Sequence, residues 1–211
     1  MLKLTLDAPR LRVLAIGSHA DDIEIGCGGT LLRLARSVEA LELHWVVLSA
    51  SGERAAEARA SAEAFGAVAE VQGFRDAFFR YGPEVKEFFE ELKGRFEPDL
   101  ILTHHGEDRH QDHRLVAELT WNTFRDHLIL EYEIPKYDGD LGTPNVFVPV
   151  SEEIAREKVK LVLDAFESQT EKHWFDEELF LGLMRVRGME GRSPSGYAEA
   201  FTCRKLSLLV E

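Results

Sequence analysis

The chain has 211 residues, 45% of them hydrophobic, and a formal net charge of -13 at pH 7. This length and composition predict one soluble globular domain over residues 1–211. The acidic balance argues against nucleic-acid backbones and anionic membrane surfaces as partners. Two cysteines, Cys27 and Cys203, are too few for a disulfide framework. The first twelve residues hold no long apolar core, so we expect no signal peptide or membrane span and a cytoplasmic protein.

Apolar runs alternate with periodic segments along the first half of the chain. The runs predict strands over 11–16, 41–48, 68–71 and 99–103, and the periodic segments predict helices beginning near Gly28, over 53–65, over 84–96 and beginning near Asp112. Strands that alternate with helices indicate βαβ units, so the predicted fold class is α/β with a mostly parallel sheet. No internal repeat interrupts this pattern.

The pattern loosens in the second half. From Ile129 the prolines and glycines predict a long irregular stretch, of the kind that is usually functional or mobile. A helix over 151–166 and terminal strands over 178–187 and 204–210 follow. Earlier in the chain, Gly26, Gly28 and Gly29 predict a tight turn close to the sheet. Their spacing differs from G-x-G-x-x-G, so these glycines do not predict a nucleotide-binding domain.

Two of the predicted strands end in clusters of imidazoles and carboxylates. The first strand leads into His19-Ala20-Asp21-Asp22, and the fourth into Thr103-His104-His105 and then His110-Gln111-Asp112-His113. Ligands bind at the carboxyl ends of the strands in open α/β sheets. If the two strands are neighbours, these groups converge on one point.

Such a set of side chains can hold a catalytic metal ion. A mononuclear zinc takes three His or carboxylate ligands and leaves its fourth position to water or substrate. It would lower the pKa of that water to roughly 7, and a nearby carboxylate would then take the proton. We expect about one Zn²⁺ per chain, with iron, cobalt or manganese as alternatives.

The two clusters resemble the motifs of a known family. His19-Ala20-Asp21-Asp22 with Glu24 is similar to the HPDD(E) motif of the LmbE-like, or PIG-L, zinc-dependent N-acetylglucosaminyl deacetylases, and His110-Gln111-Asp112-His113 is similar to their H-x-D-H motif. The resemblance implies a single Rossmann-like three-layer domain that hydrolyses the N-acetyl group of an N-acetylglucosamine-type sugar or conjugate. The chain departs from the motif at Ala20, where the family usually has proline, so the loop loses one backbone constraint.

The resemblance also implies a role for each residue that matches a motif. His19, Asp22 and His113 would bind zinc, and Asp21 would act as general base on the water. His110 would stabilise the oxyanion or protonate the leaving amine, with Asp112 orienting its imidazole. Arg54 would reach a substrate hydroxyl or phosphate.

Several alternatives remain at this point. Arg54 could form a local ion pair with Glu53 or Glu57. Another metal-dependent amidase or a phosphoesterase could use the same water, although phosphate chemistry needs several converging cations and only Arg54, Arg109 and Arg114 lie near the motifs. A catalytically lapsed sugar-binding module would have lost the base or the oxyanion histidine, and both are present.

The remaining open points concern the rest of the pocket. His104 and His105 could line it, support the metal ligands or lie on the surface, and Tyr132, Tyr137 and Trp174 could stack on a sugar or pack beneath the long loop. The expected partner is a small amino-sugar substrate. The sequence is compatible with a homo-oligomer. It does not decide which group is attached to the amino sugar.

Overall fold

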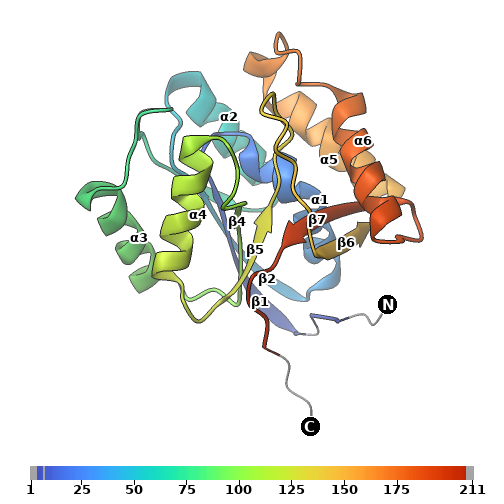
Figure 1. Ribbon diagram of the computed structural model, residues 1–211, viewed down its shortest axis with the longest axis horizontal. Helices are drawn as coiled ribbons and strands as arrows, with labels where there is room; N and C mark the ends of the chain where they lie inside the picture. The colour runs from blue at the N-terminus through green and yellow to red at the C-terminus, as the bar shows by residue number, and fades with distance from the viewer. Residues whose placement is uncertain (1–3, 7, 208–211) are drawn as a thin grey trace.

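The computed structural model describes residues 4–6 and 8–207. Its centre is a seven-stranded sheet with the order β3-β2-β1-β4-β5-β7-β6 (Figure 1). The strands are β1 (Arg10–Gly17), β2 (Ala40–Val47), β3 (Val68–Val71), β4 (Leu100–His104), β5 (Leu128–Tyr132), β6 (Val146–Val150) and β7 (Tyr197–Thr202). Strands β1 to β5 run parallel, and β7 runs antiparallel to both of its neighbours.

Six α-helices among the described residues cover the two faces of the sheet. They are α1 (Asp22–Ser37), α2 (Gly52–Ala64), α3 (Pro83–Arg95), α4 (Gln111–Thr123), α5 (Glu152–Ala165) and α6 (Glu177–Glu190). Helices α3 and α4 pack on one face, and α1, α2, α5 and α6 on the other (Figure 1). The predicted α/β fold with three layers and a mostly parallel sheet is confirmed. None of these helices is long and apolar enough to cross a membrane.

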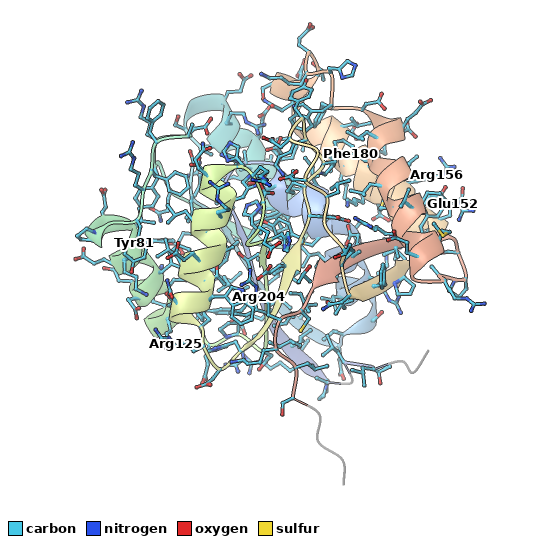
Figure 2. The ribbon with its side chains drawn as sticks, viewed as in Figure 1. Tyr81, Arg125, Glu152, Arg156, Phe180 and Arg204 are labelled. Atoms are coloured by element: carbon cyan, nitrogen blue, oxygen red, sulfur yellow. The ribbon has the colours of Figure 1, made fainter. Side chains whose placement is uncertain are left out.

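The alternation of side chains along β1 builds two cores at once. Val13 and Ala15 belong to the core beneath α1, whereas Leu14 and Ile16 belong to the core beneath α3 and α4. Successive side chains of a strand point to opposite faces, so a strand covered on both sides must be apolar throughout. The outer helices show the complementary pattern: Phe180 of α6 is buried, while Arg156 and Glu152 of α5 pair on the solvent side (Figure 2).

The prediction of a tight turn at the glycines was wrong, because they lie inside α1, which begins at Asp22. A Cβ on Gly26 would overlap the Tyr132 ring, and one on Gly29 would lie 3.1 Å from the Glu199 carboxylate. Here glycine allows close approach of the helix to the sheet and does not end a helix.

Replacing Gly26 with alanine is expected to destabilise the protein by about 1–3 kcal/mol, because the Tyr132 ring must shift within a filled core. Gly182→Ala is the matched control. Gly182 lies inside α6, and no neighbouring atom lies within 4 Å of a Cβ added there. That substitution is therefore expected to raise the free energy of unfolding by about 0.5–1 kcal/mol. Chemical denaturation measures both, and equal midpoints for the two variants would contradict the packing argument.

The second half of the chain differs most from its prediction. Residues 178–187 form helix α6, not a strand, and the terminal strand β7 precedes the predicted segment 204–210. Residues 204–207 are not a strand, and 208–210 lie outside the described residues. The stretch expected to be irregular from Ile129 contains β5 and β6. The buried positions of α6, which are Phe180, Met184, Arg187 and Gly188, follow helical spacing, a signal that the sequence carries.

The strand order reverses between β1 and β4. These strands pair in parallel, with Val13 opposite Leu100 and Ala15 opposite Leu102, so their carboxyl ends lie side by side. In open α/β sheets, ligands bind in the crevice at such a switch point. The two clusters of histidines and aspartates follow these two strands.

Candidate metal centre and active site

Three side chains of the two clusters meet at the end of β1 and β4. His19 Nδ1 lies 3.2 Å from Asp22 Oδ2 and 3.2 Å from His113 Nε2. His113 Nε2 lies 3.6 Å from Asp22 Oδ1. Ligands about 2.0–2.1 Å from a tetrahedral metal ion stand roughly 3.3–3.4 Å apart. The pairwise contacts are close to this spacing, with Asp22 facing His19 through Oδ2 and His113 through Oδ1, so the three groups can surround one metal ion. Ligand atoms of His19, His110 and His113 also lie within 4.8 Å of one another.

The outer nitrogen of each of these imidazoles faces a carboxylate. His113 Nδ1 lies 3.0 Å from Asp108 Oδ2, and His19 Nε2 lies 3.3 Å from Asp112 Oδ2. The tautomer with a proton on each outer nitrogen, His113 Nδ1 and His19 Nε2, donates to these carboxylates and leaves lone pairs on the inner nitrogens, His113 Nε2 and His19 Nδ1. In that tautomer two lone pairs and the Asp22 carboxylate point at one another, an arrangement that a cation stabilises; without a cation, the carboxylates around His19 raise its pKa against the opposing effect of burial. Metal-ligating histidines are commonly oriented in this way.

Asp108 ties the centre to the loop after β5. Its Oδ2 lies 2.8 Å from Lys136 Nζ as well as facing His113. Burial raises the pKa of Asp108, but His113 and Lys136 outweigh that effect and hold it far below its usual range. Asp108 is therefore ionised and able to orient His113.

Asp108→Asn is expected to lower metal affinity about 10–100-fold, the usual cost of removing such an outer partner. An amide can turn either an oxygen or an NH₂ toward His113, so the imidazole loses its fixed tautomer. Competition against a chromophoric chelator measures the affinity. Unchanged affinity would show that Asp108 has no part in orienting the ligand.

His104 lies in the wall of the same centre and is fully buried. Its Nε2 accepts a hydrogen bond from the Ser18 backbone N–H at 2.9 Å and lies 3.1 Å from Asp22 Oδ2, and its ring stacks on His113 with centroids 3.9 Å apart. Ligand atoms of Asp22, His104 and His113 lie within 4.8 Å of one another. With its proton on Nδ1, His104 accepts from the Ser18 N–H, and with its proton on Nε2 it can donate to Asp22, so in either tautomer Nε2 is engaged by the protein and is less available to a metal ion. His105 instead contacts Glu131 at 2.9 Å.

Asp21, immediately before α1, has one oxygen fixed and one free. Its Oδ1 lies 2.7 Å from Arg54 Nη2, whereas its buried Oδ2 has no hydrogen-bond partner in the described part of the chain. Burial raises the pKa of Asp21, with Arg54 opposing the shift. Arg54 also contacts Glu57 at 3.1 Å, so the local ion pair that was one alternative for it does form.

His110 is the residue immediately before α4. Its Nδ1 accepts from the Asp112 backbone N–H at 3.3 Å, so in the neutral ring the proton sits on Nε2. Burial lowers the pKa of His110, and the neighbouring His113 and His19 lower it further. The Asp112 carboxylate accepts from the Ala77 N–H at 2.8 Å and faces His19. The contact between Asp112 and the His110 ring is thus made by its backbone N–H.

Asp76 joins the cluster without any signal in the sequence. Its Oδ1 lies 3.2 Å from His19 Nε2, although its side chain is largely exposed. The next residue, Ala77, has φ +62°, a left-handed conformation that is uncommon outside glycine. Ligand atoms of His19, Asp76, His110 and Asp112 lie within 4.8 Å of one another. An exposed turn far from both motifs offers no pattern by which to predict this approach.

A cavity of about 830 Å³ opens over these groups. Its lining includes the candidate site residues His19, Asp21, Asp22, Arg54, His110 and His113, the aromatics Phe74, Tyr137 and Trp174, and the cations Arg75, Lys136 and Lys172. Tyr132 is not part of it, because its ring is buried and its hydroxyl donates to the Ile16 carbonyl at 2.7 Å. Arg109 and Arg114, the cations expected near the site, do not line the cavity.

The fold and the buried cluster define an α/β protein with a His/Asp site able to hold a metal ion. Residues 14–124 match the PIG-L family, described as GlcNAc-PI de-N-acetylase. The chain belongs to this family of deacetylases, which are hydrolases of carbon–nitrogen bonds. The family predicted from the two motifs is thereby confirmed.

Individual relatives agree with this membership. The uncharacterized deacetylase YaiS of Escherichia coli K12 is 31% identical over 157 residues, which cover 68% of this chain and 84% of that protein. The conserved protein TT1542 of Thermus thermophilus superposes with a TM-score of 0.78 at 24% identity, covering 95% of this chain and 97% of its own.

Two further solved structures show how widely the fold is used. The N,N'-diacetylchitobiose deacetylase of Pyrococcus horikoshii superposes with a TM-score of 0.75 at 19% identity, covering 91% of this chain and 83% of its own. GalB, the 4-carboxy-2-hydroxymuconate hydratase of Pseudomonas putida KT2440, superposes with a TM-score of 0.78 at 17% identity, covering 95% of this chain and 99% of its own. One fold carries a deacetylase and a hydratase, so the reaction must be argued from the site.

Proposed function

We propose that this chain is a zinc-dependent deacetylase that removes the N-acetyl group from an N-acetylglucosamine-type sugar or conjugate, and that residues 1–211 form one catalytic domain. The observation that carries the proposal is that Asp21, whose buried Oδ2 has no hydrogen-bond partner in the described part of the chain, lines the same cavity as His19, Asp22 and His113. Amide hydrolysis needs an activated water, a polarised carbonyl and an acid for a poor leaving group. The site offers groups suited to each task.

His19, Asp22 and His113 are the residues that hold the metal in this proposal. When bound, zinc polarises a carbonyl and lowers the pKa of a bound water to roughly 7. The chain contributes the orientation of its own ligands, through Asp112 on His19, Asp108 on His113 and His104 on Asp22. Imidazole and carboxylate donors suit zinc, and a solved relative is described as the zinc inhibited form of teicoplanin deacetylase Orf2.

Asp21 is the general base in this proposal. Arg54 holds its Oδ1, which leaves Oδ2 to accept a proton from the attacking water. A positioned base of this kind contributes about 10²–10⁴-fold to a rate. Arg54 also lines the cavity, where it can donate to a substrate hydroxyl.

His110 stabilises the tetrahedral oxyanion or protonates the leaving amine. Its Nδ1 is engaged by the Asp112 N–H, so the N–H that it can offer a substrate is on Nε2. One such donor is worth about 10²–10³-fold in kcat in the best-studied case. Asp112 has two tasks, since its backbone N–H sets the His110 tautomer and its carboxylate orients His19.

Related proteins support an acetamido sugar as the substrate. The family description names GlcNAc-PI as the compound that is deacetylated, and the name of the Pyrococcus horikoshii relative gives N,N'-diacetylchitobiose. Both compounds contain N-acetylglucosamine. Trp174 and Tyr137 line the cavity and offer flat faces for a sugar ring. The polar groups at its base meet the acetamide.

Acetate release tests the proposal. The zinc-loaded protein is incubated with N-acetylglucosamine, N,N'-diacetylchitobiose and their phosphorylated derivatives, and p-nitrophenyl phosphate serves as a probe of phosphoesterase activity. We expect acetate release that a chelator abolishes and about one equivalent of zinc restores. Phosphate release without acetate would favour the phosphoesterase, and binding of sugars without turnover would favour a lapsed sugar-binding module.

A further inference from the structure

Helix α2 carries the arginine that holds the proposed base and, three residues later, a second carboxylate. Arg54 and Glu57 lie on one face of the helix, because residues three apart are neighbours on a helix surface. Arg54 Nη2 lies 2.7 Å from Asp21 Oδ1, and Arg54 Nη1 lies 3.1 Å from Glu57 Oε2. The guanidinium is planar, so a bond at each terminal nitrogen fixes its rotation. Glu57 therefore keeps Nη2 directed at Asp21.

The face of the same guanidinium is covered by the residue that follows α5. The Arg54 Cζ atom lies 5.2 Å from the centroid of the Phe166 ring, and this ring is buried. An arginine over an aromatic face is attracted by the electrons of the ring. Arg54 is thus held by two carboxylates at its edge and by one ring at its face.

Glu57 also binds the segment after α5, which begins with the short 3₁₀-helix η1 (Glu167–Gln169). Its Oε1 accepts from the Ser168 backbone N–H at 2.9 Å, and its Oε2 accepts from the Ser168 hydroxyl at 2.7 Å. The Glu57 side chain is 11% exposed, so these bonds and the ion pair with Arg54 are largely shielded from water. Hydrogen bonds to an ionised carboxylate are roughly twice as strong as those between neutral groups. One carboxylate thus joins α2 to this segment.

Arg54 and Glu57 are the only polar anchors of residues 167–174 on other elements, among the residues that the structure describes. The other hydrogen bonds of the segment join its own residues or the adjoining Phe166 and Phe175. Three members of the segment line the cavity: Gln169, Lys172 and Trp174. The position of this wall of the cavity therefore depends on Glu57.

We propose that Glu57 is a positioning residue of the deacetylase: it holds Arg54 on the base Asp21 and, with the same carboxylate, sets the cavity wall that follows α5. This inference rests on the proposed function and adds to it a residue outside both motifs. Glu57 is not among the candidate metal ligands and does not line the cavity. Its effect on the reaction therefore passes through Arg54 and Ser168.

A double-mutant cycle tests whether Glu57 acts through Arg54. Glu57→Met keeps much of the side-chain volume and removes the charge and both acceptors. We expect kcat for acetate release from N,N'-diacetylchitobiose to fall about 10-fold or more at native zinc content, because small displacements of a catalytic group cost up to ~10²-fold. In the Arg54→Met background the same change should lower kcat less than about 2-fold, since the arginine that Glu57 positions is absent. KM, which reports on the wall, should rise in both backgrounds.

Glu53→Met is the matched control. Glu53 directly precedes Arg54 in the first turn of α2 and is exposed, so this variant is expected to keep native kcat, KM and zinc content. Glu57→Gln is a second variant in case Glu57→Met folds poorly: its amide cannot accept at both positions, so it should lose kcat in the same direction and to a smaller extent. Equal fold losses in the two Arg54 backgrounds, or native kcat per bound zinc in both Glu57 variants, would overturn the inference.

Hydrogen–deuterium exchange tests the wall without turnover. Backbone exchange over residues 167–174 is followed by mass spectrometry in the zinc-loaded native protein, Glu57→Met and Glu53→Met. We expect several-fold faster exchange in Glu57→Met, because the Ser168 N–H loses its acceptor, and native rates in Glu53→Met. If the native protein releases no acetate, the proposed function fails and the exchange comparison still decides whether Glu57 sets the wall. Exchange in Glu57→Met equal to that in Glu53→Met overturns the inference in either case.

Discussion

Replacing Asp21 with asparagine is expected to lower kcat about 10²–10⁴-fold, the contribution of a positioned general base. The side chain keeps its size, and its amide oxygen can still accept from Arg54, which now holds Oδ1 at 2.7 Å. What the variant loses is a basic oxygen at the Oδ2 position. The zinc content should stay at that of the native protein, because Asp21 is not among the three proposed ligands.

Asp22→Asn is the natural comparison, because it changes the adjacent carboxylate in the same way. Asp22 faces His19, His104 and His113, and electrostatic attraction and hydrogen bonding to these imidazoles outweigh its burial and hold its pKa far below the usual range. An amide is a poor metal ligand by comparison, so this variant should lose metal affinity. Metal analysis with acetate kinetics separates the two roles. Native kcat in Asp21→Asn, or equal metal loss in both variants, would remove Asp21 as the base.

The second large effect concerns a buried ion pair behind α1. Lys158 Nζ lies 2.6 Å from Glu199 Oε1 and donates to the Ile25 carbonyl at 2.7 Å. The Glu199 carboxylate accepts from the backbone N–H groups of Gly29 at 2.8 Å and Thr30 at 2.6 Å. The pair thus joins α5 and β7 to the helix whose first turn carries Asp22.

Lys158→Met is expected to lower the free energy of unfolding by about 3–5 kcal/mol, because Glu199 is left as a buried, unpaired carboxylate. Lys158→Met combined with Glu199→Met should cost less than the sum of the two single changes. Ile25 C=O and Gly29 N–H are an i, i+4 pair of α1, so helix geometry alone can satisfy both groups in the double variant. Urea denaturation of all four proteins measures this coupling.

Lys160→Met is the surface control for that cycle. Lys160 pairs with Asp164 on the same helix, but both side chains are well exposed, so its loss should change stability by less than about 0.5 kcal/mol. If the Lys158 and Glu199 changes were simply additive, or Lys158→Met behaved like the control, the pair would have no role in holding α1.

The catalytic cluster was predictable because its members are close together in the chain. The ligand and base candidates lie in two short motifs, one directly after β1 and one at the start of the helix that follows β4, and the parallel pairing of β1 with β4 brings the motifs together. The supporting residues differ in this respect. Asp76 and Lys136 reach the site from turns without periodicity, and their contacts depend on how those turns fold over the sheet.

Helix α1 shows a second limit of sequence patterns. Three glycines within four residues predict a turn, because glycine in a helix interior costs roughly 0.5–1 kcal/mol relative to alanine. The helix nevertheless contains them, since Tyr132 and Glu199 need the space that side chains would fill. Those two partners lie more than a hundred positions further along the chain, so no local window of sequence contains the reason.

Metal binding by the native protein and His113→Ala is the most direct measurement of the central claim. Chelator-stripped protein is titrated with zinc, and bound metal and acetate release are followed together. We expect about one zinc per native chain, with acetate release rising in proportion to bound zinc, and a loss of both in His113→Ala, because that variant removes one of three donors. Native protein that binds no metal under any loading condition, or His113→Ala that binds zinc as tightly as native, would contradict the proposed centre.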